Sequence, residues 1–206
     1  MKTILILLTL LLTSCWIPFL WSDDQEETSP TAEEIASSTK TLTTQSISIT
    51  IPSNWNEISN SSLPSPKTGT IVTALKSSDL VDDIYRSLII LEDTIIGKLS
   101  SEQYARNDYN VSIKNYSGHR LLEEKNIEYT DGISSILYTF EAKYNPNSPR
   151  MKFIQSSKIC TSSDTNKVYN VTIALPPSID DTEKYEVLIK SLSCRTDEET
   201  ETSEED

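Results

Sequence analysis

The sequence is poor in the residues that build most catalytic sites. It has one histidine, His119, and only three cysteines and four glycines among 206 residues. A Ser-His-Asp or Cys-His device would have to use His119, and its neighbours Ser117 and Gly118 do not supply such a set. Four glycines leave no Gly-rich phosphate-binding loop. These shortages favour a protein that is not an enzyme and uses no cofactor, with His119 as an exposed or structural residue of a strand.

Acidic residues are plentiful, but they are not spaced as metal ligands. Asp79, Asp82 and Asp83 lie close together, yet this segment lacks the glycine turn and the distal glutamate of a calcium loop. A solvated loop is therefore expected there. Asp180 and Asp181 are more simply explained as the cap of a helix, where carboxylates favour the N-terminal dipole. No metal site is predicted.

The net charge of −13 is concentrated at the two ends of the chain. Residues 22–45 carry six acidic residues against Lys40, and residues 196–206 carry seven more. The stretch between them, residues 46–195, has 18 acidic and 16 basic residues and is nearly neutral. Binding to nucleic acid needs a clustered basic face, so no nucleic-acid partner is expected.

An apolar stretch at the N-terminus predicts export. Lys2 is followed by residues 3–13, which are apolar apart from threonine, and the run ends in Leu12-Thr13-Ser14-Cys15. This order resembles the bacterial lipoprotein signal, in which small residues precede a lipidated cysteine. The interpretation is cleavage before Cys15 and attachment to a membrane by acyl chains such as palmitate on Cys15. The domain that follows is then extracytoplasmic.

An uncleaved signal anchor is the alternative, because residues 3–22 are free of charge over a length that spans a bilayer. Pro18 argues against it, since proline disfavours the interior of a helix. Both alternatives give the same topology, with Lys2 inside and the acidic linker outside. The apolar segment 16–21, with Trp16 and Trp21 at its ends, is suited to the membrane interface.

The two remaining cysteines, Cys160 and Cys194, form an even pair in a chain sent to an oxidising compartment. A disulfide between them is expected. The alternative is two buried thiols, since free cysteine packs as a small apolar residue.

The length favours one domain with tails. The organisation expected is a lipoprotein signal and lipobox at 1–15, an interfacial segment and disordered acidic linker at 16–45, a globular domain at 46–195 and an acidic tail at 196–206. Alternating apolar residues predict strands, and two amphipathic patterns predict helices that begin near Ser100 and Asp180. An Asp-Gly turn at 131–132 predicts a hairpin. The expected strands are 46–51, 69–76, 84–96, 119–129, 133–144, 151–161 and 167–175.

The stretch Ile49-Thr50-Ile51-Pro52-Ser53-Asn54-Trp55, with the order of elements after it, resembles the PsbP-like fold. That group includes an extrinsic subunit of photosystem II and the bacterial DcrB lipoproteins. The resemblance implies an α+β fold, an antiparallel sheet of about six to seven strands flanked by helices in an α/β/α sandwich. It also implies adaptor or binding roles at membranes and supplies no active-site residues.

Three functions remain open at this point. The first is a membrane-anchored, non-catalytic binding or adaptor domain for a protein complex of the cell envelope. The second is a lipoprotein that binds or handles a small ligand in a pocket between sheet and helices. The third, an envelope hydrolase, is the least favoured, because no catalytic set is evident.

Overall fold

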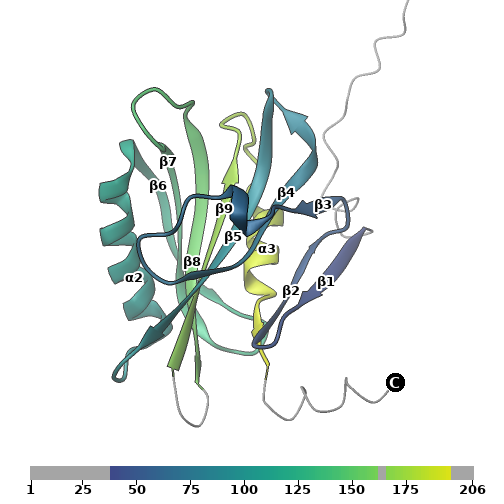
Figure 1. The fold of residues 1–206 in the computed structure, drawn as a ribbon. Coiled ribbons are helices and arrows are strands. Elements are labelled where there is room, and N and C mark those ends of the chain that lie inside the picture. The colour runs from purple at the N-terminus through teal and green to yellow at the C-terminus, as the bar shows by residue number, and fades with distance from the viewer. Residues whose placement is uncertain (1–37, 162–165, 196–206) are drawn as a thin grey trace, which may run out of the picture.

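A seven-stranded antiparallel sheet forms the centre of the domain (Figure 1). The computed structural model describes residues 38–161 and 166–195. The strand order is β3-β4-β5-β9-β8-β7-β6. This confirms an α+β fold with a mostly antiparallel sheet. The strands are β3 (Trp55–Glu57), β4 (Thr70–Val81), β5 (Ile84–Ile95), β6 (Ser117–Glu128), β7 (Ser134–Lys143), β8 (Met151–Thr161) and β9 (Asn166–Leu175).

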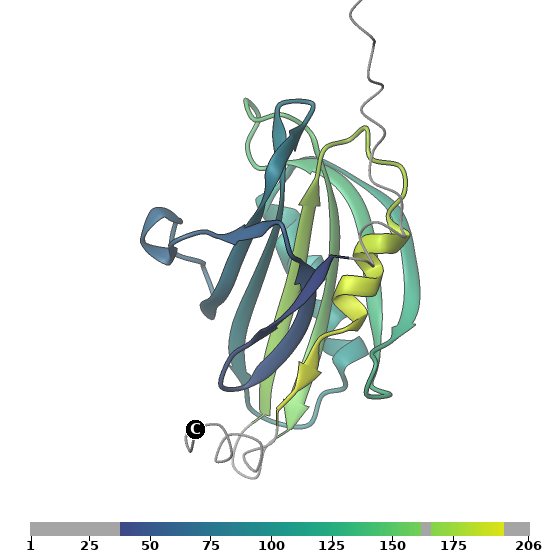
Figure 2. The ribbon, with the colours of Figure 1, turned by 90° about the vertical axis from the view of Figure 1, so that its right-hand side faces the viewer.

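One face of this sheet is covered by helix α3 (Glu183–Lys190) and by a second, small sheet (Figure 2). The small sheet has the order β1-β2-β10, with strands β1 (Thr39–Thr43), β2 (Ile47–Pro52) and β10 (Ser193–Cys194). The main core lies between these layers. Alternate isoleucines of β2 point into it, and each is at most 1% exposed. The core also contains the apolar stripe of α3, Tyr185, Leu188 and Ile189, and Leu192 just beyond the helix.

Helix α2 (Ser101–Ser112) packs on the opposite face, mainly against β7 and β8. It begins with the capping box expected from the sequence: Ser100 Oγ accepts from the Gln103 N–H at 3.2 Å, and the Gln103 side chain accepts from the Ser100 N–H at 3.1 Å. Reciprocal bonds of this kind satisfy two free N–H groups at a helix start. Ala105 and Tyr109 bury the helix in a second, smaller core with Phe140 and Phe153. Two 3₁₀ turns, η1 (Asn60–Ser62) and η2 (Ile113–Asn115), lie in the connections.

Two expected boundaries differ from the structure. The stretch predicted as linker up to residue 45 contains β1, which pairs with β2 over its whole length. The polar composition of this strand resembles that of a linker, because four of its five residues are exposed. The last helix has Thr182 as its N-cap, without a side-chain hydrogen bond. Asp180 and Asp181 therefore do not cap it, and Asp180 instead lies 3.5 Å from Lys152.

Strand β5 is fully covered on one face and partly covered on the other. Apolar residues on both faces of a strand are typical of a strand that is covered above and below. Leu88 and Ile90 are fully buried on the α3 face, but Ile89 and Leu91, which point the other way, are only half-buried. The second face is therefore partly open at β5.

A buried lysine joins the β6–β7 turn to the end of α3. Lys158 has a fully buried side chain, and its Nζ donates to Asp131 at 2.6 Å and to the Leu192 carbonyl. The ammonium also lies 4.6 Å from the centre of the Tyr129 ring. Burial lowers the pKa of Lys158, and the Asp131 carboxylate opposes that change. A buried charge must be paired in this way to be tolerated, so the network holds turn, strand and helix in one arrangement.

The Cys160 and Cys194 side chains are in bridging geometry, with Cα atoms 5.6 Å apart, within the usual range for a disulfide. Cys194 lies on β10, the short strand that follows α3. We predict that the mature protein has no free thiol at these positions. Mass analysis after alkylation, with and without reduction, checks this; two alkylated thiols in the unreduced protein would contradict it.

Replacing both residues, Cys160→Ala with Cys194→Ala, should lower the free energy of unfolding by roughly 3 to 4 kcal/mol, as the chain-entropy relation gives for a closed loop of this size. Urea unfolding under non-reducing conditions measures the difference. Under reducing conditions the two proteins should unfold nearly alike.

Candidate functional site

The one histidine of the chain is part of an aromatic cluster. His119 Nε2 lies 2.8 Å from the Tyr109 hydroxyl, and its ring packs against Phe140 with centroids 5.2 Å apart. Tyr109 in turn stacks on Tyr138, with centroids 3.9 Å apart. Burial raises the pKa of Tyr109 to about 12 and lowers that of His119. These contacts make His119 a structural residue that joins β6 to α2.

A polar seam runs along the other border of α2, where the helix meets β8 and β9. Asp108 accepts a hydrogen bond from the Gln155 amide at 2.6 Å, and Ser112 Oγ lies 3.5 Å from the Gln155 carbonyl oxygen. On β8, Ser157 Oγ donates to Asn170 Oδ1 of β9 at 2.5 Å. Burial raises the pKa of Tyr104, and the nearby Asn170 side chain opposes this rise. Tyr104, Asp108 and Ser112 recur every four residues, so they form one stripe along the helix; with Gln155, Ser157 and Asn170 they are called the α2 seam below.

The sheet beyond this seam is open to solvent in part. Ile89 pairs with Thr172 and Leu91 with Asn170 across the β5–β9 ladder, and paired residues of antiparallel strands share a face. Ile89, Leu91 and Thr172 are half-buried. Asp93 follows on the same face, two residues beyond Leu91, and is also half-buried. These four residues, called the open face below, form an apolar strip that ends in a carboxylate.

A long loop, residues 58–69, passes in front of the sheet toward α2 (Figure 1). At its start the Ile58 N–H donates to the Ala74 carbonyl at 2.8 Å. At its far side Lys67 Nζ donates to Asn115 in η2. Gly69, with φ +70°, returns the chain to β4 so close to the Glu92 carbonyl that any side chain there would clash. The loop is thus fixed at both ends, and the open face has the α2 seam on one side and this loop in front.

Asp108 is a carboxylate in an unfavourable environment. Burial raises its pKa, the hydrogen bond from Gln155 opposes this, and the nearby Asp93 charge raises it further. The same two carboxylates contribute to the raised pKa of Tyr104, after burial as the main cause. Burial thus disfavours the charged form of Asp108. A carboxyl group in such an environment, within a partly open polar cluster, is typical of a functional site.

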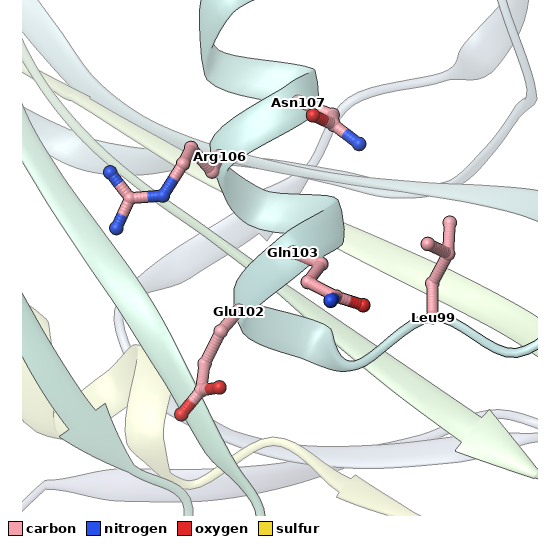
Figure 3. Close-up of a pocket in the computed structure, with 5 residues that line it drawn as sticks. All are labelled: Leu99, Glu102, Gln103, Arg106 and Asn107. Atoms are coloured by element: carbon pink, nitrogen blue, oxygen red, sulfur yellow. The ribbon is translucent and has the colours of Figure 1, made fainter.

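A separate shallow recess of about 480 Å³ lies on the outer side of α2. Figure 3 shows Glu102 and Arg106 on one side of the helix, with Gln103, Asn107 and Leu99 on the other. Leu99 is 41% exposed, and Arg106 pairs with Glu124 of β6 at 2.9 Å. The recess is lined mainly by exposed polar side chains, two of which, Gln103 and Arg106, are already engaged by Ser100 and Glu124.

The other residues singled out from the sequence lie elsewhere. Asp79 pairs with the buried Arg86, while Asp82 and Asp83 form the β4–β5 turn with positive φ. Across residues 38–161 and 166–195, no three His, Cys, Asp or Glu side chains gather as a metal site. Cys15 lies outside the described residues. No helix in the described part of the chain is long and apolar enough to cross a membrane.

No family model matches this chain. No curated protein matches it either. Three solved structures are similar in part. A protein from Bacteroides thetaiotaomicron shares 14% identity and a TM-score of 0.39 over 74% of this chain, which spans only 46% of that protein. PA94 of Pseudomonas aeruginosa, of unknown function, shares 14% identity and a TM-score of 0.47 over 77% of this chain and 98% of its own.

The third structure is LpqN of Mycobacterium tuberculosis, described as involved in cell envelope biogenesis. It shares 11% identity and a TM-score of 0.49, over 82% of this chain and 98% of its own. At these identities and scores the three likenesses carry no argument about function. They also do not confirm the PsbP-like or DcrB-like fold expected from the sequence.

Substituting Asp108→Asn should stabilise the protein at neutral pH. The folded state raises the pKa of this carboxyl, so its contribution to stability is present in acid, below the unfolded pKa, and is lost as pH rises through the folded pKa. Asparagine keeps an oxygen to accept from Gln155 without the buried charge. Urea unfolding near pH 7.5 and near pH 3 measures the difference, on either side of the usual range for Asp of about 4. A variant that is less stable than the parent at neutral pH would contradict this account of Asp108.

Proposed function

We propose that this protein is a lipid-anchored, non-catalytic binding or adaptor domain of a protein complex in the cell envelope, with a domain of the PsbP-like group. The observation that carries the proposal is the open face of the sheet. Ile89 and Leu91 are half-buried beside fixed polar groups of the α2 seam. Apolar side chains next to oriented hydrogen-bonding groups form a surface that a partner can bury.

The N-terminal sequence supports the location. Leu12-Thr13-Ser14-Cys15 follows an apolar run, and acylation there holds the chain at a membrane. A single acyl chain gives only weak retention, so the apolar segment 16–21 adds to it. The acidic linker then separates the domain from the bilayer surface.

A small-ligand lipoprotein is the second candidate, because Asp108 and Gln155 converge beside the apolar strip, as polar groups do in ligand pockets. The open arrangement favours the adaptor. Small-molecule sites usually enclose most of their ligand, whereas Ile89, Leu91 and Thr172 are half-buried on a face that is only partly covered.

Photo-crosslinking in cells tests the binding role. A photoreactive residue at Val111, 61% exposed and one helical turn from Asp108, is compared with one at Val187, 63% exposed on α3. We expect a discrete protein adduct from position 111 and none from position 187. Equal adducts from both positions, or a co-purifying small molecule with no adduct, would contradict the adaptor function.

The anchor is checked in the same cells with an alkyne analogue of palmitate. The parent chain should incorporate the label and start at residue 15, while Cys15→Ser should incorporate none. An unlabelled parent chain that keeps residues 1–14 would show a signal anchor instead.

A further inference from the structure

Strand β6 is a free edge of the seven-stranded sheet. It is the last strand in the order and pairs only with β7. It has twelve residues, whereas β3 at the opposite edge has three. An edge strand leaves every second backbone N–H and C=O without a partner in its own sheet. The sheet therefore ends, on this side, in a long row of backbone groups to which another strand can bond.

The hairpin between β6 and β7 fixes which backbone groups point outward. The Tyr129 N–H donates to the Ile133 carbonyl at 2.9 Å, so these two residues form a hydrogen-bonded pair that continues the register of the ladder. Hydrogen-bonded and non-hydrogen-bonded pairs alternate along an antiparallel ladder. Glu124, Asn126 and Glu128 are therefore in non-hydrogen-bonded pairs, and their N–H and C=O groups point away from β7. Within residues 38–161 and 166–195, no backbone hydrogen bond from outside β7 reaches them.

The second half of β6 is regular enough to accept a strand. Both register irregularities of β6 lie before Glu123, so residues 123–128 pair with β7 without interruption. Bulges and edge lysines are common means of blocking an edge strand. The one lysine of this segment, Lys125, is instead held on the other face by Glu186 of α3 at 2.6 Å. Residues 123–128 therefore lack both obstacles.

Acidic side chains border this segment on the α2 face. The Glu124 carboxylate contacts Arg106 of α2 at 2.9 Å, and Asn126 and Glu128 follow at every second residue, so the three β6 side chains share that face. All three are exposed. A second copy of β6 would add further glutamates to this row, and like charges opposite each other are destabilising, whereas opposite charges are favourable. The row therefore favours an added strand with basic side chains on this face.

We infer that β6 accepts an extended segment of a partner protein as a further strand, bonded to the backbone of Glu124, Asn126 and Glu128. Lysine or arginine at alternate positions of that segment lies beside the two glutamates. In this mode of recognition the main-chain bonds give affinity and the alternate side chains give specificity. The inference goes beyond the proposed function, because β7 and β8 separate this edge from the open face on β5 and β9.

Backbone NMR of the mature full-length chain tests the edge directly, with a blocked hexapeptide of alternating lysine and threonine as the probe. In the protein alone, the amide protons of Glu124, Asn126 and Glu128 should exchange rapidly with solvent. Those of Lys125 and Ile127, which bond to β7, should exchange slowly. Addition of the peptide should shift and protect the first three.

Three results of this experiment would overturn the inference. The first is slow exchange of the three outward amides in the dilute protein alone, which would show that the edge is already closed. The second is protection that rises with protein concentration without peptide, which would assign the edge to a second copy. The third is a set of peptide-induced shifts confined to the acidic tail 196–206.

Variants separate the backbone contact from the charge contact. Asn126→Pro removes one outward N–H, a change that edge strands tolerate, and should weaken peptide binding by about fivefold or more, as loss of a hydrogen bond does. Asn126→Ala keeps the N–H and should bind as the parent does. Glu124→Lys with Glu128→Lys leaves the backbone intact and should transfer the preference to a glutamate–threonine peptide. Glu57→Lys with Asp181→Lys makes the same charge change at other exposed positions and should not. An unchanged preference in the β6 charge variant would contradict the basic partner, and equal binding by Asn126→Pro and Asn126→Ala would contradict strand addition.

Discussion

The constraint on which this structure depends is that a broad antiparallel sheet has two faces to cover and the described chain has two short helices to do so. Helix α3 is only eight residues long, and the small sheet β1-β2-β10 completes the cover on its face. On the other face, helix α2 packs on β7 and β8 and does not extend beyond the α2 seam. The half-buried residues of β5 and β9 are the direct consequence of that shortage, and they are the surface to which we assign binding.

Most of the fold was predictable because its elements carry strong local signals. The capping box at Ser100, the Asp-Gly turn and the alternation of β9 each specify a local structure, and the structure follows them. The failures have local causes as well. Strand β1 is too polar to be separated from a linker by composition, and Asp180 and Asp181 lie outside the helix they were expected to cap, since the helix starts from Thr182.

The candidate site was not predictable to the same degree. The repeat of Tyr104, Asp108 and Ser112 is visible in the sequence, but Gln155, which contacts Asp108 and Ser112, comes from a strand more than 40 residues further along the chain. The apolar residues of β5 were a misleading signal, because a strand that is apolar on both faces normally lies under cover on both. Here Leu91 and Ile89 are only half-buried. The apolar pattern of β5 predicts burial on both faces, but the structure buries only one face fully. This difference identifies the surface to which we assign binding.

The most direct measurement of the central claim, that a partner completes the cover of this sheet, is carbene footprinting of the protein in native membranes and after purification. Labelling of the peptide that contains Ile89 and Leu91 should be strong in the purified protein and suppressed in the membranes. The peptide that contains Val187 should be labelled equally in both states. Equal labelling of Ile89 and Leu91 in both states would show that nothing covers the open face in the cell, and would contradict the account.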